Sequence, residues 1–343
     1  MQNLVAAADG DITRTLELRA LGAVELAPKA RRSLLSPDIG SLRSDLEWVA
    51  RSGAHLCAST DCDYPAQLRQ MQGAPAVLFA LGNVAALASR QLAIVGARGA
   101  SVGGRRTARD FAISFARAGL TVTSGLAVGI DAAGHEGALL AGGVTVAVCG
   151  TGLDRIYPAE HAALAAQIRQ RGALVSEFPP GTPARKHNFP RRNRLISALS
   201  MGTVVVEAAR DSGSLITAQH AREQGRALFA VPGSIYNPLA AGCHDLIRSG
   251  ATLASSATEV LAQLKIPLSN EGLTSSQAAR GRAPALDKGY EMLLDAVGFE
   301  PVSVDCLVAR TGLPGASVAS MLLVLELEGW IAPYPGGRYC RIP

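Results

Sequence analysis

The feature that most constrains the fold is an alternation of short apolar runs with helical segments between residues 92 and 231. Each run is rich in β-branched or aliphatic residues. The runs cover residues 92–95, 120–123, 144–148, 174–178, 203–207 and 227–231. Uninterrupted apolar strands separated by helices are typical of a parallel sheet that is covered on both faces. We therefore expect an α/β fold with an extended, Rossmann-like, doubly wound and mostly parallel sheet.

Turns rich in glycine, serine and threonine follow four of these runs, after residues 95, 123, 148 and 207. In an open α/β sheet, the carboxyl ends of the parallel strands form one rim, and ligands bind there. We therefore expect the four turns to meet on one surface. The site candidates that the turns contribute are Gly96, Ser124, Gly125 and Gly129.

A basic stretch over residues 185–194 follows the fourth run. Five of its ten side chains are permanently cationic, none is acidic, and Phe189 lies among them. Pro190 suits the first turn of a helix, where the unpaired amides and the helix dipole favour anions. The alternative is a solvated charged loop, but such a loop usually also contains acidic residues. Phe189 is either a stacking platform or a hydrophobic staple for the helix.

The familiar catalytic motifs are absent. The glycines after residue 95 do not form GxGxxG, no Gly-Lys-Ser/Thr is present, and no GxSxG elbow occurs. Asp131, His135 and Glu136 lie near a helix start and could act as acid or base, but we expect Asp131 to cap that helix. Glu207 and Asp211 are expected to orient Arg or Asn side chains. What remains is a surface of amides, hydroxyls, cations and one aromatic ring, which favours binding of single-stranded nucleic acid.

The composition of the chain limits the kinds of ligand, metal site and cell compartment that we expect. The 343 residues carry a net charge of +5 and have a pI near 9.0, which is compatible with a polyanionic ligand. The six cysteines are scattered without a CxxC pair, which argues against a metal site or a disulfide framework and favours reduced cytoplasmic thiols. No apolar run is long enough to cross a membrane, and no leader pattern opens the chain. We expect a cytoplasmic protein without a cofactor or metal.

The two ends of the chain predict smaller units. Residues 1–55 indicate short helices, at 15–21, 29–35 and 44–49, the last with Ser44 as its N-cap. Residues 266–284 are typical of a linker, and residues 285–343 predict three helices and a β-hairpin, as in a winged helix. From residue 286 onward there are seven acids and four bases, and residues 317–328 contain no Lys or Arg. Because a winged helix that reads DNA should be basic, we expect this unit to contact a protein or the core.

Several motifs together resemble the DprA/Smf family (DNA-processing protein A). They are the segments at residues 124–131, 148–154 with Tyr157-Pro158, 176–183, 207–218 and 231–233. The resemblance covers about residues 60–265, and residues 56–265 are taken as the core domain. The N-terminal unit resembles the family's SAM or helix-hairpin-helix-like domain only weakly, at residues 20–23.

The resemblance implies a function and a set of site residues. It implies a non-enzymatic, homodimeric protein that binds single-stranded DNA and helps load RecA recombinase onto it during natural transformation, with single-strand-binding protein as a further partner. It places Arg98, Lys186 and Phe189 in the DNA-contacting set, supported by the turn at residues 124–129 and Asn188. The complete predicted set of DNA-binding residues is Gly96, Arg98, Ser124, Gly125, Gly129, Arg185, Lys186, Asn188, Phe189, Arg191, Arg192 and Asn193.

A second function stays open at this stage. Related Rossmann-like nucleotide-processing enzymes, such as phosphoribohydrolases, carry a PGGxGTxxE-type motif with a catalytic Glu. The nearest equivalent here, residues 211–217, offers the Thr217 hydroxyl where a carboxylate would be needed.

Overall fold

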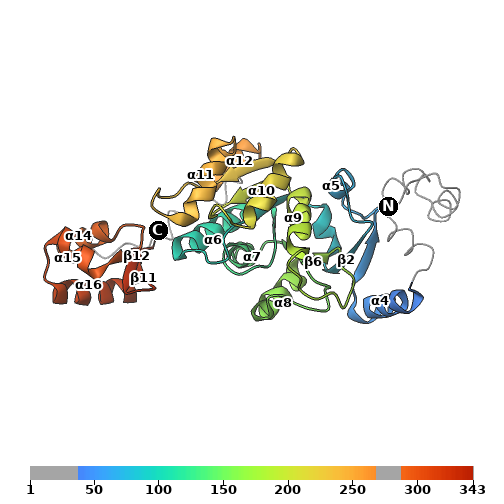
Figure 1. Cartoon of the computed structure of the whole chain (residues 1–343), viewed down its shortest axis with the longest axis horizontal. Helices are drawn as coiled ribbons and strands as arrows, with labels where there is room; N and C mark the ends of the chain where they lie inside the picture. Colours follow the sequence, from blue (N-terminus) through green and yellow to red (C-terminus); the bar gives the residue numbers. More distant parts are fainter. Residues whose placement is uncertain (1–37, 268–286, 343) are drawn as a thin grey trace.

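A nine-stranded sheet forms the centre of the computed structural model, which describes residues 38–267 and 287–342 (Figure 1). The strand order is β1-β2-β6-β5-β4-β3-β7-β8-β9, and all neighbours from β6 to β9 are parallel. The strands are β1 (His55–Ala58), β2 (Val77–Gly82), β3 (Gln91–Val95), β4 (Thr121–Ser124), β5 (Thr145–Val148), β6 (Ala173–Ser176), β7 (Gly202–Val205), β8 (Ala227–Ala230) and β9 (Thr252–Leu253). The expected doubly wound, mostly parallel sheet is confirmed.

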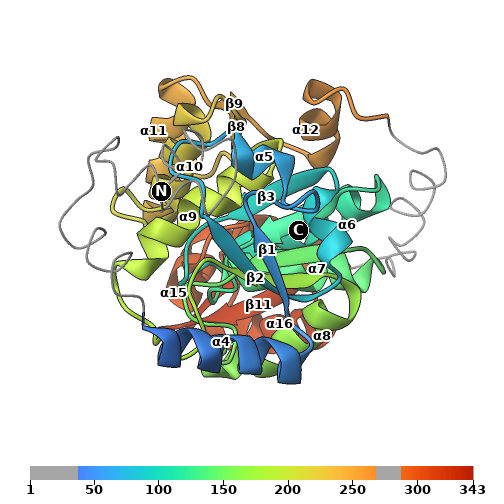
Figure 2. The same ribbon diagram turned by 90° about the vertical axis from the view of Figure 1, so that its right-hand side faces the viewer.

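Helices cover both faces of the sheet (Figure 2). The helices of the first part of the chain and the core are α4 (Ile39–Ser52), α5 (Ala66–Arg69), α6 (Val102–Arg117), α7 (Ile130–Leu140), α8 (Ala162–Arg171), α9 (Asn188–Leu199), α10 (Ser214–Glu223), α11 (Ala241–Arg248) and α12 (Ala257–Gln263). Within β3, Leu92 and Ile94 pack in the cluster that includes α6 and α7, whereas Ala93 and Val95 pack in the cluster with α9 and α10. Both faces of the strand are therefore buried, which is why its sequence is uninterruptedly apolar.

The first two strands were not predicted. β1 and β2 pair antiparallel with each other, and β2 pairs antiparallel with β6, so they extend one edge of the parallel sheet. They lie outside the regular strand–helix alternation, which begins at residue 91. An antiparallel edge strand on a parallel sheet is common in large α/β folds.

Helix α4 corrects the predicted start of the third N-terminal helix. The helix begins at Ile39, and its N-cap is Asp38, whose Oδ1 atom accepts from the Ser41 amide at 3.0 Å. Ser44 lies inside the helix and donates to the Gly40 carbonyl oxygen, so its expected role as N-cap was wrong. The helices expected at residues 15–21 and 29–35 lie outside the described residues.

The C-terminal unit is a small helical domain with its own core and a three-stranded sheet of order β10-β12-β11. Its elements are α14 (Lys288–Val297), β10 (Val302–Ser303), α15 (Val304–Thr311), α16 (Gly315–Leu327), β11 (Ile331–Tyr334) and β12 (Arg338–Arg341). This confirms the three helices and the hairpin. In the described ranges no single helix is long and apolar enough to cross a membrane, and only α15 and α16, bent by 111°, meet that criterion as a pair.

Candidate nucleic-acid interface

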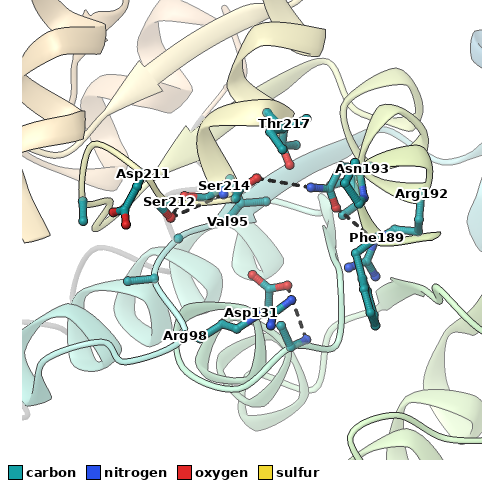
Figure 3. Close-up of a pocket in the computed structure, with 18 of the residues that line it drawn as sticks. Val95, Arg98, Asp131, Phe189, Arg192, Asn193, Asp211, Ser212, Ser214 and Thr217 are labelled. Carbon is teal, nitrogen blue, oxygen red and sulfur yellow. Dashed lines mark hydrogen bonds between the residues drawn. The ribbon is translucent and has the colours of Figure 1, made fainter. Parts of the chain in front are cut away.

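A cavity of about 680 Å³ opens at the carboxyl ends of the parallel strands (Figure 3). It lies where β3 is flanked by β4 on one side and β7 on the other, which is the point where the order of the strands reverses. Its walls come from the turn after β3, the segment after β7, and the first turns of α9 and α10. Ligands of doubly wound folds bind at such a switch point. The rim inferred from the glycine-rich turns is therefore a real concave surface.

Two predicted glycines allow the turns after β3 and β4 to cross in close contact. A Cβ atom on Gly129, whose φ is +84°, would lie 2.4 Å from the carbonyl oxygens of Ala97 and Arg98. A Cβ on Gly96 would lie 2.6 Å from the Ile130 side chain. Because both positions exclude any side chain, the backbone that carries Arg98 is held firmly against the start of α7. The Arg98 side chain itself is exposed.

Asp131 braces the turn after β4 from inside. Its Oδ2 atom accepts from the amides of Gly125 at 3.1 Å and Ala127 at 3.4 Å, and burial raises the pKa of this carboxyl while Arg192 lowers it. The N-cap position of α7 is Gly129, so the expectation that Asp131 caps this helix was wrong. Ser124 is also internal, since its buried hydroxyl donates to the Ile94 carbonyl oxygen at 2.6 Å.

Arg192 is a buried cation rather than a surface one. Only 4% of the residue is exposed, and its Nη1 atom donates to the carbonyl oxygens of Gly125, at 2.5 Å, and Val148. Its Nε atom donates to Asn193, which in turn donates to Gly213 at 3.3 Å. Arg192 thus ties the first turns of α9 to the ends of β4 and β5. The sequence did not indicate that the Arg192 side chain points into the protein.

Asn188 and Phe189 anchor the start of α9 above the same strand ends. The buried Asn188 amide donates to the carbonyl oxygens of Gly150 at 3.0 Å and Pro183 at 3.3 Å. The Phe189 ring packs so closely on Gly150 that a Cβ there would lie 2.9 Å from the ring. Its centroid lies 5.5 Å from that of Tyr157, with the two rings tilted by 42°. Tyr157 was missed as a site residue, although the Tyr-Pro pair had already been noted as a motif.

Three of the predicted cations are exposed to solvent, and two of them, Arg98 and Lys186, line the cavity together with this aromatic pair. Arg98, Arg185 and Lys186 are exposed, and within the described part of the chain none of them forms an ion pair with an acid. The Arg98 guanidinium lies 5.6 Å from the Phe189 ring centroid. A cation over a ring face is attracted by the ring's quadrupole. Arg98 and Lys186 therefore add positive charge to the cavity wall that carries the half-buried Phe189 ring, and this charge is available to an anionic ligand.

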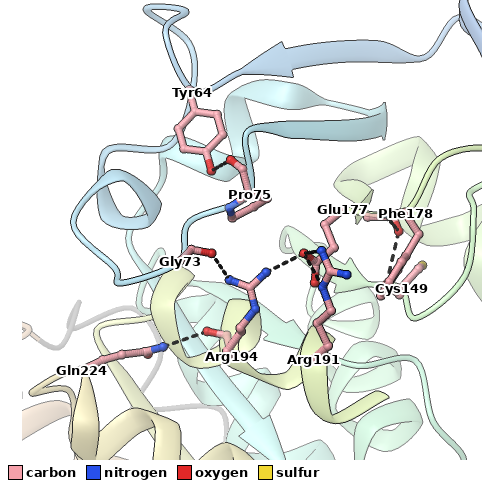
Figure 4. Close-up of polar contacts among 10 residues, drawn as sticks. Tyr64, Gly73, Pro75, Cys149, Glu177, Phe178, Arg191, Arg194 and Gln224 are labelled. Carbon is pink, nitrogen blue, oxygen red and sulfur yellow. Dashed lines mark hydrogen bonds and ion pairs between the residues drawn. The ribbon is translucent and has the colours of Figure 1, made fainter. Parts of the chain in front are cut away.

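Arg191 and Arg194 belong to a different, internal network (Figure 4). Both pair with Glu177, whose side chain is only 1% exposed, and Arg191 does so at 2.9 Å. Arg194 also donates to the Gly73 carbonyl oxygen at 2.5 Å. Of the two, Arg191 keeps a side chain that is 60% exposed. Two guanidiniums on one carboxylate leave this network with a net positive charge.

One acid near the cavity, Glu207, is engaged in a structural contact. Glu207 accepts from the Ser101 amide at 2.9 Å and from its hydroxyl at 2.6 Å, and thereby occupies the N-terminus of α6. In dinucleotide-binding folds that helix terminus holds the pyrophosphate. The expectation that Glu207 orients an Arg or Asn was wrong, because its partner is Ser101. Asp211 lies exposed at the cavity wall.

His135 and Glu136 are not among the residues that line the cavity. His135 is fully buried against Thr145, with a 2.7 Å contact at Nδ1, and burial together with His161 and Arg192 lowers its pKa to about 3. Glu136 pairs with Arg109 at 2.6 Å on the surface. Across residues 38–267 and 287–342, no group of three or more His, Cys, Asp or Glu side chains is placed to hold a metal ion.

Comparison with known protein families shows to which family this chain belongs. The model of a family described as DNA recombination-mediator protein A matches residues 55–265, and the model of the DprA winged helix domain matches residues 277–337.

The chain belongs to the DprA/Smf family.

Its relatives within the DprA/Smf family cover most of the chain. Protein Smf of Escherichia coli K12 is 46% identical over 306 residues, which are 88% of this chain and 81% of that one. The structure of DNA processing protein A from Streptococcus pneumoniae has a TM-score of 0.62 at 36% identity, covering 72% of this chain and 90% of that chain. DNA processing protein A from Helicobacter pylori, whose structure is described by its single-stranded DNA binding mode, has a TM-score of 0.57 at 25% identity, covering 62% and 95%.

Within this DprA/Smf fold, the predicted site residues divide into two groups. Exposed or half-buried groups that can reach a ligand are Arg98, Arg185, Lys186, Phe189 and Arg191. Groups that shape the cavity from behind or from its wall are Gly96, Ser124, Gly125, Gly129, Asn188, Arg192 and Asn193. That any of them contacts DNA stays a prediction.

Proposed function

We propose that this DprA/Smf protein binds single-stranded DNA in the cavity at the carboxyl rim of its sheet. The observation that carries the proposal is the half-buried Phe189 ring in a cavity wall that it shares with two exposed cations, Arg98 and Lys186, neither of which forms an ion pair with an acid in the described part of the chain. Cations alone suit any polyanion, whereas a ring among them offers a face on which an unpaired base stacks. Base pairs of a duplex are already stacked on each other, so the ring favours single strands.

The contact between Arg98 and the Phe189 ring suggests how a DNA strand binds at the site. In the free protein the Arg98 guanidinium lies 5.6 Å from the Phe189 centroid. An arriving base takes that position on the ring, and the guanidinium turns to the phosphate of the same nucleotide. The Arg98 guanidinium therefore has a favourable partner before and after binding, first the Phe189 ring and then the phosphate. Because no base edge is read in this arrangement, binding tolerates most sequences.

We further propose that the bound strand is passed to RecA recombinase during natural transformation. The description of the family as a recombination mediator supports this role, and it suits a site that holds single strands without chemistry. Two of the acids near the cavity, Asp131 and Glu207, hold backbone amides and a serine hydroxyl, which supports a non-enzymatic protein. We also propose a cytoplasmic homodimer that acts on strands covered by single-strand-binding protein.

We infer the following division of the chain. Residues 1–55 form a helical N-terminal domain, 56–265 the DNA-binding core, 266–284 a linker and 285–343 the winged-helix-like domain. The separate hydrophobic cluster of the C-terminal unit supports its independence from the core.

Fluorescence anisotropy with single- and double-stranded oligonucleotides of the same sequence tests the binding proposal. We expect the single strand to bind more tightly by at least an order of magnitude. Equal affinity for the two forms would make the cavity a general polyanion site. Incubation with nucleoside monophosphates is the parallel test for an enzyme, since release of free base would contradict a purely binding function.

The RecA proposal needs its own assay. RecA ATPase activity is followed on single strands coated with single-strand-binding protein, with and without this protein. Stimulation is expected from the wild type. If a variant that no longer binds DNA stimulates equally, the mediator role does not depend on the cavity.

A further inference from the structure

The start of α10 forms a wall of the cavity that the predicted set of site residues does not include. Ser212, Ser214 and Thr217 line the cavity there, and all three carry hydroxyl groups. The first turn of the helix contains no acid, and its N-cap is Gly213, which has no side chain to bind the helix amides. The positive end of the helix dipole therefore lies at the cavity without a negative charge from the helix itself.

The first amides of α10 are already bound within the chain. The Leu215 amide donates to the Ser212 carbonyl oxygen at 3.0 Å, and the Ile216 amide donates to that of Gly213 at 3.3 Å. The Asn193 side chain, which ties α9 to this turn, also donates to the Gly213 carbonyl oxygen at 3.3 Å. The hydroxyls are therefore the main donors that this wall can offer to a ligand.

The Thr217 hydroxyl indicates that a ligand binds at this wall. Thr217 is only 1% exposed, yet its hydroxyl has no hydrogen-bond partner among the residues that the structure describes. Figure 3 shows its oxygen directed toward the space between Ser214 and Asn193. A buried hydroxyl without a partner is unfavourable, so a ligand atom that accepts a hydrogen bond from it removes that cost.

Ser212 and Ser214 supply a second donor. Their hydroxyl oxygens lie 2.8 Å apart, and the Ser212 Oγ atom also accepts from the Ser214 amide at 3.4 Å. Two hydroxyls carry two hydrogens, and the bond between them uses one, so one O–H is left for a ligand. Because Ser214 is only 9% exposed, this pair is held in place before a ligand arrives.

We propose that this hydroxyl wall, formed by Ser212, Ser214 and Thr217, binds a phosphate group of the nucleotide whose base stacks on Phe189. Phosphate oxygens accept hydrogen bonds, and the positive end of α10 favours their charge. The inference rests on the proposed single-strand function and adds a second contact to the same nucleotide. Arg98 then pairs with the phosphate on one side of that nucleotide, and the hydroxyl wall binds the phosphate on the other side.

Asp211 opposes this role and therefore reports on it. It is exposed and lines the same wall, two residues before the N-cap of α10. Its carboxylate repels a phosphate that is bound there, although salt weakens the repulsion. Asp211→Asn should therefore strengthen single-strand binding about threefold at low salt, and the gain should disappear at high salt. Without a gain at low salt, the phosphate lies away from this wall.

Fluorescence anisotropy with oligothymidylate and two Thr→Val variants of the full chain tests the hydroxyl contact. Thr217→Val keeps the shape of the side chain and removes its hydroxyl. Because that hydroxyl has no partner within the described chain, the melting temperature should not fall, whereas the affinity should fall about tenfold or more. Thr217→Ser should retain most of the binding.

Thr203→Val is the matched control for Thr217→Val. The Thr203 hydroxyl is also buried and without a partner in the described part of the chain, but it lies in β7 and does not line the cavity. The control should bind like the wild type. A loss of affinity in Thr217→Val with a melting temperature well below that of the control would assign Thr217 a structural role and overturn the phosphate contact.

The salt dependence separates this contact from those of the cations. Thr217→Val removes no charge, so the slope of log affinity against log salt concentration should equal that of the wild type. Oligothymidylates with and without a 5′-phosphate distinguish the sources of the phosphate. A larger effect of Thr217→Val on the phosphorylated strand assigns the site to a strand end, and an equal effect assigns it to the phosphodiester backbone.

Failure of this inference is distinguishable from failure of the proposed function. If Thr217→Val binds like the wild type while Phe189→Ala binds weakly, the hydroxyl wall does not contact the strand, and single-strand binding in the cavity stands. If the wild-type protein does not bind oligothymidylate at all, the proposed function fails and the phosphate contact fails with it.

Discussion

The Arg192 guanidinium lies 6.0 Å from the centroid of the Phe189 ring, and both residues line the cavity. The same guanidinium holds the carbonyl oxygens at the ends of β4 and β5. One buried side chain therefore connects the sheet to the ring that we propose as the stacking platform. The exposed Arg98 lies 5.6 Å from that ring, so Phe189 has one buried and one exposed cation beside it.

Lys186→Ala should reduce the salt dependence of single-strand binding. Each phosphate contact that a cation makes contributes about −0.7 to the slope of log affinity against log salt concentration. We expect the slope to flatten by about that amount, as measured by anisotropy at several salt concentrations. Arg171→Ala is the control, because Arg171 ends α8 immediately before the start of β6, at the opposite rim of the sheet. An unchanged slope in a folded Lys186 variant would place the DNA elsewhere.

Phe189→Ala should weaken single-strand binding by about 1–3 kcal/mol, since it removes the stacking face. Phe189→Trp should retain most of the binding. Phe189→Leu separates the two roles of the ring, because it keeps apolar contact with Gly150 but cannot stack. If the Leu variant binds like the wild type while the Ala variant melts several degrees lower, the ring is a packing staple for α9.

Deletion of residues 285–343 should leave binding of a short oligonucleotide nearly intact. The cavity is built entirely by residues between 95 and 239, and the deleted unit contributes no cation on α16. An oligonucleotide that fits one core excludes the avidity gained from linked sites, so we expect less than about a tenfold change in affinity. A loss of several orders of magnitude would make the winged helix a DNA reader.

Acidification should destabilise the fold through His135. Its pKa is about 3 when buried against Thr145, whereas an unfolded His titrates near 6.5. Below about pH 6.5 the unfolded chain therefore takes up a proton that the folded chain does not, and stability falls until about pH 3. Between pH 7 and pH 5 this group should account for about 2 kcal/mol of lost stability.

Denaturant melts at the two pH values check this effect of His135. His135→Asn should lose less stability on acidification than the wild type, and His187→Asn, at an exposed position, should behave like the wild type. Equal losses in all three proteins would assign the acid sensitivity to other groups.

The sequence by itself determined the sheet and its functional rim. Leu92, Ala93, Ile94 and Val95 are apolar without interruption because alternate residues face different helical layers, and such a pattern has few explanations other than a covered parallel strand. Glycines at the strand ends then marked the rim, since Gly96 and Gly129 occupy positions that exclude a side chain. The apolar pattern and the glycines depend on residues close together in the sequence, so they can be recognised from one amino-acid sequence.

The tertiary structure alone decided which way the polar side chains point. Arg191 and Arg192 are adjacent and chemically identical, yet one is largely exposed and the other is buried beneath Phe189. Their positions on α9 direct them to different neighbours, Glu177 for the first and the ends of β4 and β5 for the second. Asp131 likewise braces a turn instead of capping its helix because the chain brings the Gly125 amide to it. Arg192 meets its partners only when strands distant in sequence pair, whereas Asp131 meets the Gly125 amide, six residues away, only in the folded turn. Burial of a charge depends on such partners.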